Sequence, residues 1–350
     1  MQIVVGASAV LKKYGSVEDW LKDDGIKPDA RVTMTLEGGS NVAMVKTAGL
    51  GMIEFSSLLE SLNPDLVVVR GDRYEILPIA TAAAYMNKTI AHIEGGDLTG
   101  TIDESVRHAV TKLSHIHFAT NEASRERIIG MGENPRFVFN VGSPDVELVA
   151  KNRAIITNKD LHDAGVGTRP DIKESFLIVM QHPVTTEMDK NMGNVEETLR
   201  AVCDLKMPTI WFWPNIDAGT DEVSGVMRRY REETGINNHT LFLKHLPPAK
   251  FISLLKKCSC LAGNSSCGIK ECSYLGIPVV NIGTRQDGRM RAYNVVDVEY
   301  NRHQIRNAIK KQLEAGRYAK SNIYYKKDSS KEIADILAHC DLYIQKKFHV

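Results

Sequence analysis

Short apolar runs that alternate with amphipathic stretches constrain the fold of this chain more than any other feature. The runs are rich in valine and isoleucine, and the stretches between them carry apolar residues three and four positions apart. This alternation is typical of parallel strands whose sheet is covered by helices on both faces. We therefore predict an α/β fold. The predicted strand segments are 1–5, 31–36, 64–73, 88–96, 116–121, 136–144, 174–184, 208–217, 240–248, 260–268 and 277–285.

The alternation is interrupted once, between residues 151 and 172, where apolar runs thin out and polar residues, glycine and proline take over. Such a composition is typical of a hinge between domains. We predict two Rossmann-like, doubly wound domains that face a cleft, at residues 1–155 and 172–327, followed by a closing helix at 328–350. In open sheets of this kind, ligands bind beyond the carboxyl ends of the strands.

Composition excludes several classes of function. Charged residues make up 25% of the chain and the net charge is +1, so no basic excess indicates a nucleic-acid partner. The N-terminal residues lack the charged region and the long apolar run of a signal peptide. No stretch approaches the ~18–20 uncharged apolar residues of a membrane span. We expect a cytoplasmic protein without a membrane partner.

Four of the six cysteines, Cys258, Cys260, Cys267 and Cys272, fall within fifteen residues and raise the possibility of a metal site. Their spacing, C-x-C-x6-C-x4-C, does not match the paired C-x2-C elements of structural zinc sites. A cytosolic setting also disfavours disulfides. We predict reduced, buried thiols and no metal, with a metal site as the less favoured alternative.

Almost every predicted strand is followed by an ionisable or amide side chain. The exits are 70–73, 92–96, 181–184, 214–217, 244–247, 263–268 and 283–289. Connectors selected only for turn geometry favour Gly, Pro, Asn, Asp and Ser. The side chains beyond that requirement are Arg73, Glu94, His182 and Arg285, and they indicate a polar ligand.

The segment GNSSCGIKE, residues 263–271, has the composition of an anion site. Ser265 or Ser266 can cap the helix that follows, and its free N–H groups can bind a diphosphate. An ordinary serine-capped helix is the alternative. Glu271 can accept ribose hydroxyls or simply face solvent. The segment matches neither the Walker motif nor G-x-G-x-x-G, so no dinucleotide cofactor is indicated.

The stretch HIEGGDLTGTIDESVRH, residues 92–108, carries more charge than a connector needs. Thr101 and Glu104 fit a capping box, and Asp103 suits the first turn of a helix. Asp103 and Arg107 are four residues apart and can pair on one helix face. Glu94, in a glycine-flanked bend directly after a strand, has no such structural explanation.

These segments together resemble the UDP-N-acetylglucosamine 2-epimerase family, specifically its hydrolysing branch, which supplies sialic-acid-type sugars. The similar motifs are GDRYE, HIEGGDLTGTIDESVRHAVTKLSH, QHPVTTE, PNIDAG, GNSSCGIKE and GTRQDGR, in the family's order across nearly the whole chain. The resemblance implies a fold of the GT-B type that binds a UDP-sugar. It also implies chemistry without NAD or metal, so that no cofactor is expected.

The resemblance implies a reaction in which UDP leaves C1 of the sugar, C2 loses its proton to give a glycal, and water then adds with the opposite C2 configuration. Such a path needs acid/base groups at the sugar and donors for the departing diphosphate. The implied catalytic residues are Asp72, Glu94, Asp103 and His182, with Asp103 the first choice for the C2 proton. The implied substrate-binding residues are Arg73, Arg107, Asn215, Leu246, Ser265, Ser266, Glu271 and Arg285.

One departure from the family concerns the N-terminus. Family members begin with a further strand and a Gly-Thr-Arg loop, whereas this chain starts at what resembles their second strand. Either the start of the sequence is misassigned or truncated, or the protein lacks that strand and one phosphate contact. The product expected from UDP-N-acetylglucosamine is N-acetylmannosamine. The alternatives are an epimerase of a diacetamido-sugar nucleotide, a GT-B glycosyltransferase and an inactive nucleotide-sugar-binding protein. By resemblance we expect a homodimer or homotetramer.

Overall fold

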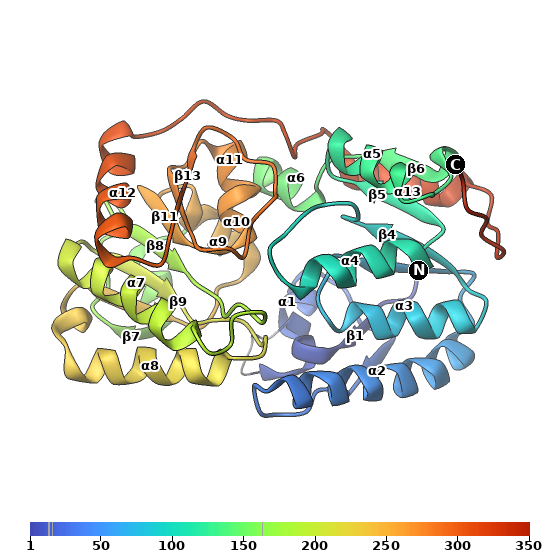
Figure 1. The fold of residues 1–350 in the computed structure, drawn as a ribbon, viewed down its shortest axis with the longest axis horizontal. Coiled ribbons are helices and arrows are strands. Elements are labelled where there is room, and N and C mark those ends of the chain that lie inside the picture. The colour runs from blue at the N-terminus through green and yellow to red at the C-terminus, as the bar shows by residue number, and fades with distance from the viewer. Residues whose placement is uncertain (13–14, 16, 163) are drawn as a thin grey trace. The chain divides into compact units, whose positions relative to one another are not determined.

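The computed structural model describes residues 1–12, 15, 17–162 and 164–350. The chain divides into two compact units, shown in Figure 1. The first unit comprises Met1–Lys12, residues 17–147 and Ile323–Val350, and the second comprises Leu148–Asn322. The crossover from the first unit to the second therefore falls inside helix α6, Pro144–Lys151, and the C-terminal segment belongs to the first unit.

The first unit is built on a parallel four-stranded sheet in the order β3-β4-β5-β6. Its strands are β3 Leu66–Arg70, β4 Thr89–Ile93, β5 Ile116–Ala119 and β6 Val138–Asn140. Arg70, the last residue of β3, lies opposite Ile93, the last residue of β4, so the two following loops leave the sheet side by side. Strands β1 (Val4–Gly6) and β2 (Ala30–Val32) form a separate parallel pair.

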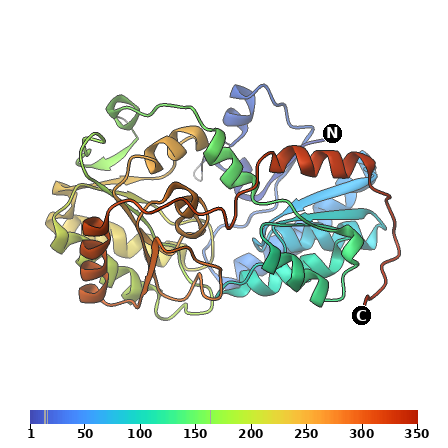
Figure 2. The ribbon, with the colours of Figure 1, turned by 90° about the horizontal axis from the view of Figure 1, so that it is seen from above.

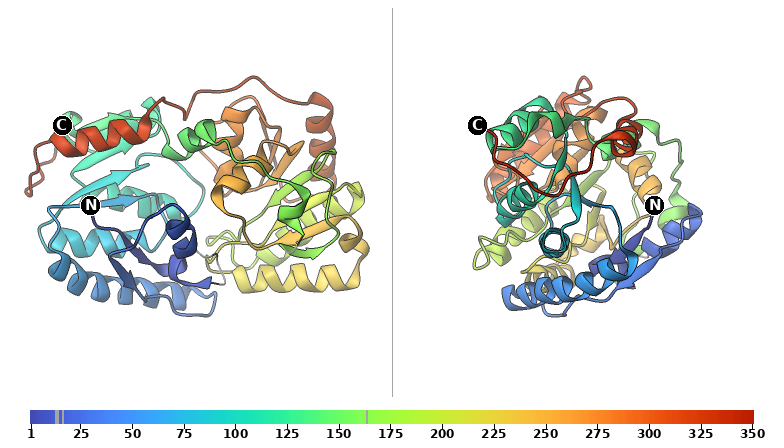
Figure 3. Two further views of the ribbon diagram at one scale, coloured as in Figure 1. Left: turned by 180° about the vertical axis from the view of Figure 1, so that it is seen from behind. Right: turned by 90° about the vertical axis from the view of Figure 1, so that its right-hand side faces the viewer.

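Helices connect these strands, and the apolar residues of the first unit pack between the helices and the strands. The helices are α1 Val17–Asp23, α2 Asn41–Leu62, α3 Ile76–Tyr85, α4 Ile102–Leu113 and α5 Glu122–Gly130. Helix α2 lies along α3, as Figure 3 shows. Val32 of β2 and Val69 of β3 share one core with Phe55 and Leu59 of α2.

By length and composition, α2 is the one helix in the described residues that could cross a membrane. It carries Lys46, Glu54 and Glu60, so it is not the uncharged apolar stretch that the sequence was predicted to lack. One face of α2, which includes Phe55 and Leu59, is buried in the core of the first unit, whereas Val45 and Ile53 are exposed. Length and composition alone do not distinguish a helix that packs on a core by one face from a membrane span.

The C-terminal segment was predicted to be a closing helix at 328–350. A helix is present, but α13 spans only Ser329–His339, and the prediction is wrong for the residues after it. Ile333 packs against Phe118 of the sheet, and Figure 2 shows α13 lying over the strands of the first unit. The residues after His339 form neither helix nor strand, and their backbone bonds to the rest of the first unit: His115 Nε2 contacts the carbonyl of Ile344 at 2.9 Å.

The second unit is built on a seven-stranded sheet in the order β13-β12-β11-β8-β9-β10-β7. Its strands are β7 Gly165–Gly167, β8 Leu177–Met180, β9 Thr209–Phe212, β10 Thr240–Leu243, β11 Cys260–Gly263, β12 Val279–Ile282 and β13 Val295–Val298. Its helices are α7 Asn191–Leu205, α8 Thr220–Glu233, α9 Pro248–Leu255, α10 Ser266–Ile269, α11 Glu271–Leu275 and α12 Arg302–Ala315. All strands are parallel except β7, which runs antiparallel to β10.

The order of these strands creates a topological switch point. The chain proceeds from β8 outward through β9 and β10, and then returns to place β11 on the other side of β8. Ligands in open α/β sheets bind at such a reversal. The loops after β8 and β11 are those that contain His182 and the segment GNSSCG.

Successive residues of one strand pack into cores on opposite faces of the sheet. Both faces therefore need apolar residues, which explains why polar and apolar residues do not alternate along the strand sequences. Leu177 and Val179 of β8 pack on one face of the sheet with helices α7, α8 and α12, whereas Ile178 packs on the other face with α9. The predicted parallel sheet with two covered faces is thereby confirmed.

The clustered cysteines divide between these two faces. Cys260 lies in the core on one side of the sheet, whereas Cys258, Cys267 and Cys272 lie in the core on the other side. All four are buried and outside any disulfide, as predicted. Burial raises the pKa of Cys258 to about 12 and keeps it protonated.

A buried carboxylate joins the C-terminal tail to the first unit. Glu133 is 2% exposed and accepts hydrogen bonds from Lys112 (2.6 Å), Lys346 of the tail (2.7 Å) and His117 (3.1 Å). Burial alone would raise the pKa of Glu133, but the bonds from His117 and the two lysines lower it to about 2. The carboxylate is therefore charged at neutral pH and holds the tail in place.

Replacing Glu133 by Gln should lower the free energy of unfolding at pH 7 by about 3 kcal/mol, because two cations lose their buried partner. A lowered pKa contributes stability above the unfolded value of 4.5 and loses it as the pH falls toward about 2. The difference between variant and wild type should therefore shrink below pH 4.5. Urea unfolding at pH 7 and pH 4 measures it, and exposed Glu122→Gln is the control. Equal stability at pH 7 would contradict this role.

Candidate functional site

The loops after β3 and β4 carry three of the predicted carboxylates. Asp72 lies in the loop after β3, Glu94 directly follows β4, and Asp103 lies in the first turn of α4, where the loop ends. Because β3 and β4 are paired in register at their last residues, Asp72 and Glu94 emerge from neighbouring points of the sheet. All three are half-buried, so their side chains lie within the fold and can still meet a ligand.

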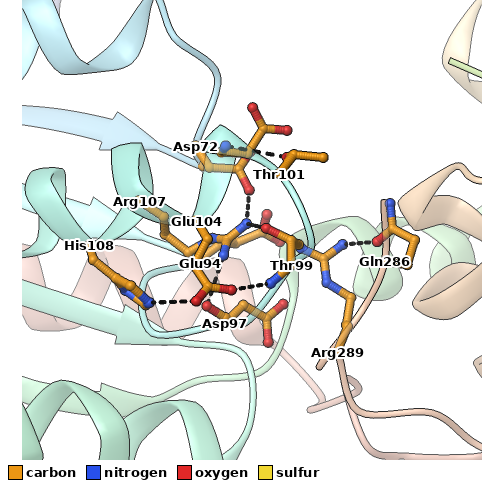
Figure 4. Close-up of polar contacts among 12 residues, drawn as sticks. Asp72, Glu94, Asp97, Thr99, Thr101, Glu104, Arg107, His108, Gln286 and Arg289 are labelled. Carbon is orange, nitrogen blue, oxygen red and sulfur yellow. Dashed lines mark hydrogen bonds and ion pairs between the residues drawn. The ribbon is translucent and has the colours of Figure 1, made fainter. Parts of the chain in front are cut away.

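Arg107 of α4 ties these loops together. Its guanidinium is 1% exposed and forms an ion pair with Asp72, while it donates to the carbonyl oxygen of Asp97 at 2.8 Å and to Thr99 Oγ1 at 3.2 Å (Figure 4). A buried cation of this kind needs a charged partner and acceptors for its other N–H groups. Arg107 therefore acts as the common support of the two loops.

These contacts revise the interpretation of Arg107. The sequence predicted that it pairs with Asp103 on the surface of the helix or contacts substrate, but the structure buries it and pairs it with Asp72. The helical spacing placed Asp103 and Arg107 on one face, but spacing along a helix cannot show that a loop 35 residues earlier supplies the partner.

Glu94 adopts a backbone conformation that is rare for a residue with a side chain. Its φ of +70° lies in the left-handed region, which costs an L-residue on the order of 1–2 kcal/mol. The bend is held because the N–H of Glu94 donates to Phe118 O at 2.8 Å and that of Gly71 donates to Ile93 O at 2.9 Å. An unfavourable backbone geometry that is retained at a charged residue directly after a strand supports a functional role.

The two glycines after Glu94 are required by close packing. A Cβ at Gly95 would lie 2.9 Å from Thr111 Oγ1 and 3.0 Å from His92 Nδ1.

Burial lowers the pKa of His92 to about 4, so the ring is neutral. Its Nε2–H donates to Gly71 O at 2.9 Å, which leaves Nδ1 to accept from Thr111 at 3.1 Å. His92 thus joins the β3 and β4 loops to α4 and does not titrate near neutral pH.

Replacing Gly96 by Ala should destabilise the protein by about 3 kcal/mol and remove activity with it. The new Cβ would lie 2.3 Å from the carbonyl oxygen of Ser124, and the φ of +76° is itself unfavourable for alanine. Thermal unfolding and turnover measure the effect. Gly130→Ala is the control, because its Cβ would meet nothing within 4 Å. Equal Tm shifts for the two variants would contradict the packing explanation.

The start of α4 confirms the predicted cap but not the predicted capping box. Thr101 is the N-cap, and its Oγ1 accepts from the N–H of Asp103 at 3.3 Å. Glu104 accepts from the N–H of Thr99 at 2.6 Å, so it holds the loop rather than closing a box with Thr101. Asp103 lies in the first turn of α4, where the helix dipole favours an acidic residue.

Arg73 and Arg70 occupy the two ends of the loop that contains Asp72. Arg73 pairs with Glu75 at 3.4 Å, and its side chain is 38% exposed. Arg70 contacts Glu94 at 3.4 Å and forms an ion pair with Asp145 at the start of α6. The sequence predicted a ligand contact for Arg73 and overlooked Arg70.

In the second unit, His182 lies at the topological switch point. Its backbone is clamped by Asn264 of the β11 loop, whose Oδ1 accepts from the N–H of His182 at 2.7 Å and whose Nδ2 donates to its carbonyl at 2.8 Å. His182 Nδ1 accepts from the N–H of Asn215 at 3.2 Å. Since Nδ1 is an acceptor here, the neutral ring carries its proton on Nε2.

Arg285 belongs to the same group. Its Nη1 donates to Asn264 O at 3.3 Å, and Nη2 lies 3.5 Å from Asp217 Oδ2. Gln286 adds a second donor to Asn264 O at 2.9 Å and accepts from Arg289 at 2.9 Å (Figure 4). The loops after β8, β9, β11 and β12 are therefore joined around Asn264.

The remaining predicted ligand residues follow β10 and β11. Ser265 is the N-cap of α10, and its Oγ accepts from Cys267 N at 3.4 Å, which confirms the predicted cap. Ser266 is the first residue of α10, a single turn that ends at Ile269, and Glu271 begins α11 after a break at Lys270. Leu246 lies in the β10 loop and packs partly against the core.

Besides Arg70, two residues in these groups were not predicted from the sequence. Ser143, in the loop after β6, is buried and donates to Glu94 Oε1 at 2.9 Å. Asn264 lies inside the GNSSCG segment, in which the sequence predicted a role only for the two serines. Both follow strands, so the strand-exit criterion would have found them if it had been applied to β6 and to buried amides.

Fold and site together define an α/β protein of two Rossmann-like units with charged strand exits. The family model for UDP-N-acetylglucosamine 2-epimerase matches residues 2–338. The chain belongs to this family and is a UDP-sugar 2-epimerase.

Relatives with known names agree with this assignment. A UDP-N,N'-diacetylbacillosamine 2-epimerase (hydrolyzing) of Legionella pneumophila is 32% identical over 95% of this chain and 86% of its own length. A GDP/UDP-N,N'-diacetylbacillosamine 2-epimerase (hydrolyzing) of Campylobacter jejuni is 30% identical over 86% of this chain and 77% of its own. The UDP-N-acetylglucosamine 2-epimerase of Neisseria meningitidis is 27% identical over 99% and 90%.

The fold is also that of solved structures. The Neisseria meningitidis UDP-GlcNAc 2-epimerase, crystallised with UDP-GlcNAc, superposes with a TM-score of 0.75 at 16% identity and covers 97% of this chain and 100% of that one. The predicted two-domain GT-B-type fold is confirmed.

Proposed function

We propose that the protein is a hydrolysing 2-epimerase, which converts a UDP-linked N-acetylhexosamine and water into UDP and the free 2-epimeric sugar. The observation that carries the proposal is the Arg107 support, which binds the Asp72 loop to the loop that begins with Glu94 and ends at Asp103. Three carboxylates on supported loops suit a reaction that moves a proton and passes through positive charge.

The C2 proton of the sugar is not adjacent to a carbonyl group and is therefore weakly acidic. Cleavage of the C1–O bond to UDP builds oxocarbenium character, which acidifies C2–H and permits elimination to a glycal. Water then gives its hydroxyl to C1, and a proton reaches C2 from the opposite face. Asp103 takes the C2 proton in this proposal, and Asp72 and Glu94 stabilise the positive charge and handle the second proton.

The residues of the second unit serve the leaving group. His182, with its proton on Nε2, can donate to the departing diphosphate, and Arg285 with the N–H groups at Ser265 and Ser266 can stabilise its charge. Arg73 and Asn215 are proposed to contact phosphate or sugar, Glu271 the ribose, and the Leu246 backbone the uracil. No metal or cofactor is required by this scheme.

UDP-N-acetylglucosamine, giving N-acetylmannosamine, is one candidate substrate. A diacetamido-sugar nucleotide is the second, and a specific observation favours it: the relatives at 32% and 30% identity carry that name, whereas the UDP-N-acetylglucosamine enzyme is at 27%. Products from both substrates, separated by mass spectrometry, decide between them.

Three outcomes of one assay distinguish the competing functions. Free epimerised sugar together with UDP supports the proposal, and a reaction in D2O should place deuterium at C2. A UDP-linked epimer would show a non-hydrolysing enzyme. Transfer of sugar to an added acceptor without inversion at C2 would show a glycosyltransferase, and UDP binding without turnover of any UDP-HexNAc would show an inactive binding protein.

A further inference from the structure

Glu94 is held by more than its own loop. Its side chain is 11% exposed, and its two carboxylate oxygens meet groups from different elements: Oε1 accepts from Ser143 at 2.9 Å, and Oε2 lies 3.4 Å from Arg70 Nη2. Arg70 is the last residue of β3, and Ser143 precedes α6. The carboxylate of Glu94 is therefore directed from two sides.

The guanidinium of Arg70 is shared between two acids. The same Nη2 that faces Glu94 forms an ion pair with Asp145 in the first turn of α6, whose side chain is 34% exposed. The negative charge of Asp145 partly offsets the positive charge of Arg70, which weakens the attraction between Arg70 and Glu94. The ion pair with Asp145 also fixes the position of the guanidinium group. Neither residue was assigned a role by the motifs, because each lies just outside the segments that resemble the family.

From this arrangement we propose that Arg70 is a positioning residue, which aims the Glu94 carboxylate and keeps it ionised, and that Asp145 moderates the strength of this effect. The proposal rests on the function proposed above for Glu94. A cation about 4 Å from a carboxylate favours the ionised form, and a second carboxylate on the same cation weakens that influence.

No other charged group described around Glu94 shares a cation with it in the way that Arg70 is shared between Glu94 and Asp145. Asp72 from the β3 loop is in an ion pair with Arg107 from α4, so these two charges are opposite and in contact (Figure 4). His92 of β4 is neutral because burial lowers its pKa. Phe118 of β5 and Ser143 contribute only a carbonyl oxygen and a hydroxyl. Arg70 and Asp145 are thus the pair whose alteration should act on Glu94 selectively.

Opposite single changes test the proposal. Arg70→Gln should lower kcat about tenfold. It should also move the acid limb of the pH–rate profile to higher pH by about half to one pH unit. The shift should be at the low end of this range because the side chain of Arg70 is 45% exposed and its charge is screened by solvent. Asp145→Asn should move the same limb downward. Arg70→Lys should restore the limb but only part of kcat, because it keeps the charge and loses the planar fork.

A matched control is Arg136→Gln, which removes another arginine that pairs with an aspartate (Asp341, 2.7 Å) on the surface of the first unit. It should leave the profile unchanged. Shifts in the same direction for Arg70→Gln and Asp145→Asn, or no shift, would overturn the proposal and leave the epimerase function intact.

A second readout does not depend on turnover. Protein labelled with carbon-13 at the glutamate side-chain carboxyl can be titrated by NMR, with Glu94 assigned through its loss in Glu94→Gln. The Glu94 midpoint should rise in Arg70→Gln and fall in Asp145→Asn. If the wild type turns over no UDP-HexNAc, the proposed function fails, whereas these midpoints still decide whether Arg70 controls Glu94.

Discussion

Replacing Asp103 with asparagine should lower kcat by about 10²-fold or more while KM changes little, because the amide cannot take the C2 proton. Asp103 lies in the first turn of α4, where its N–H bonds Thr101 Oγ1 at 3.3 Å, and asparagine retains this backbone contact. The loss is therefore expected to be chemical and not structural. Steady-state release of UDP, together with the Tm of the variant, measures it.

Glu104 supplies the matched control, since it is the adjacent carboxylate on the same helical turn. It accepts from Thr99 N at 2.6 Å, and the amide oxygen of glutamine can accept the same bond. Glu104→Gln should therefore stay within a few-fold of wild-type kcat. Equal losses for the two variants would assign Asp103 a role in loop structure alone.

Replacing Glu94 with glutamine should also lower kcat by about 10²-fold or more. The neutral amide cannot exchange a proton or stabilise an oxocarbenium-like charge. The structural cost should be small, because glutamine can still accept from Ser143 at this position and leaves the left-handed backbone unchanged. Turnover and incorporation of deuterium at C2 in D2O measure the effect.

Asp97→Asn is the control for the Glu94 change. Asp97 lies in the same loop, is 5% exposed and accepts from Ser124 Oγ at 3.1 Å through its carboxylate, a bond that the asparagine oxygen can accept. It should retain most of the activity. A near-wild-type rate for Glu94→Gln would exclude Glu94 from the chemistry and explain its conformation as structural.

Much of the fold followed from the sequence because its signals are local. Valine- and isoleucine-rich runs between amphipathic stretches predicted a parallel sheet with two covered faces, and Leu177 and Ile178 of β8 do enter opposite cores. Thr101 was predicted as a cap, and Ser265 was one of two serines predicted to cap the next site helix, since a helix start depends on a few adjacent residues. The end of the closing helix was misplaced, because tertiary contacts of the tail compete with helical propensity after His339.

The sequence by itself determined which loops carry charge, since every loop that follows a strand of a parallel sheet leaves at the same edge. Only the tertiary structure decided how those charges are paired. Arg107 meets Asp72, Glu94 meets Arg70 and Ser143, and Asn264 clamps His182 across 82 residues. Such pairs depend on the order of strands in the sheet and on the path of the backbone, such as the φ of +70° at Glu94. Neither leaves a local pattern in the sequence, so the charged stretch at 92–108 indicated a site, and only the fold showed which partners its members contact.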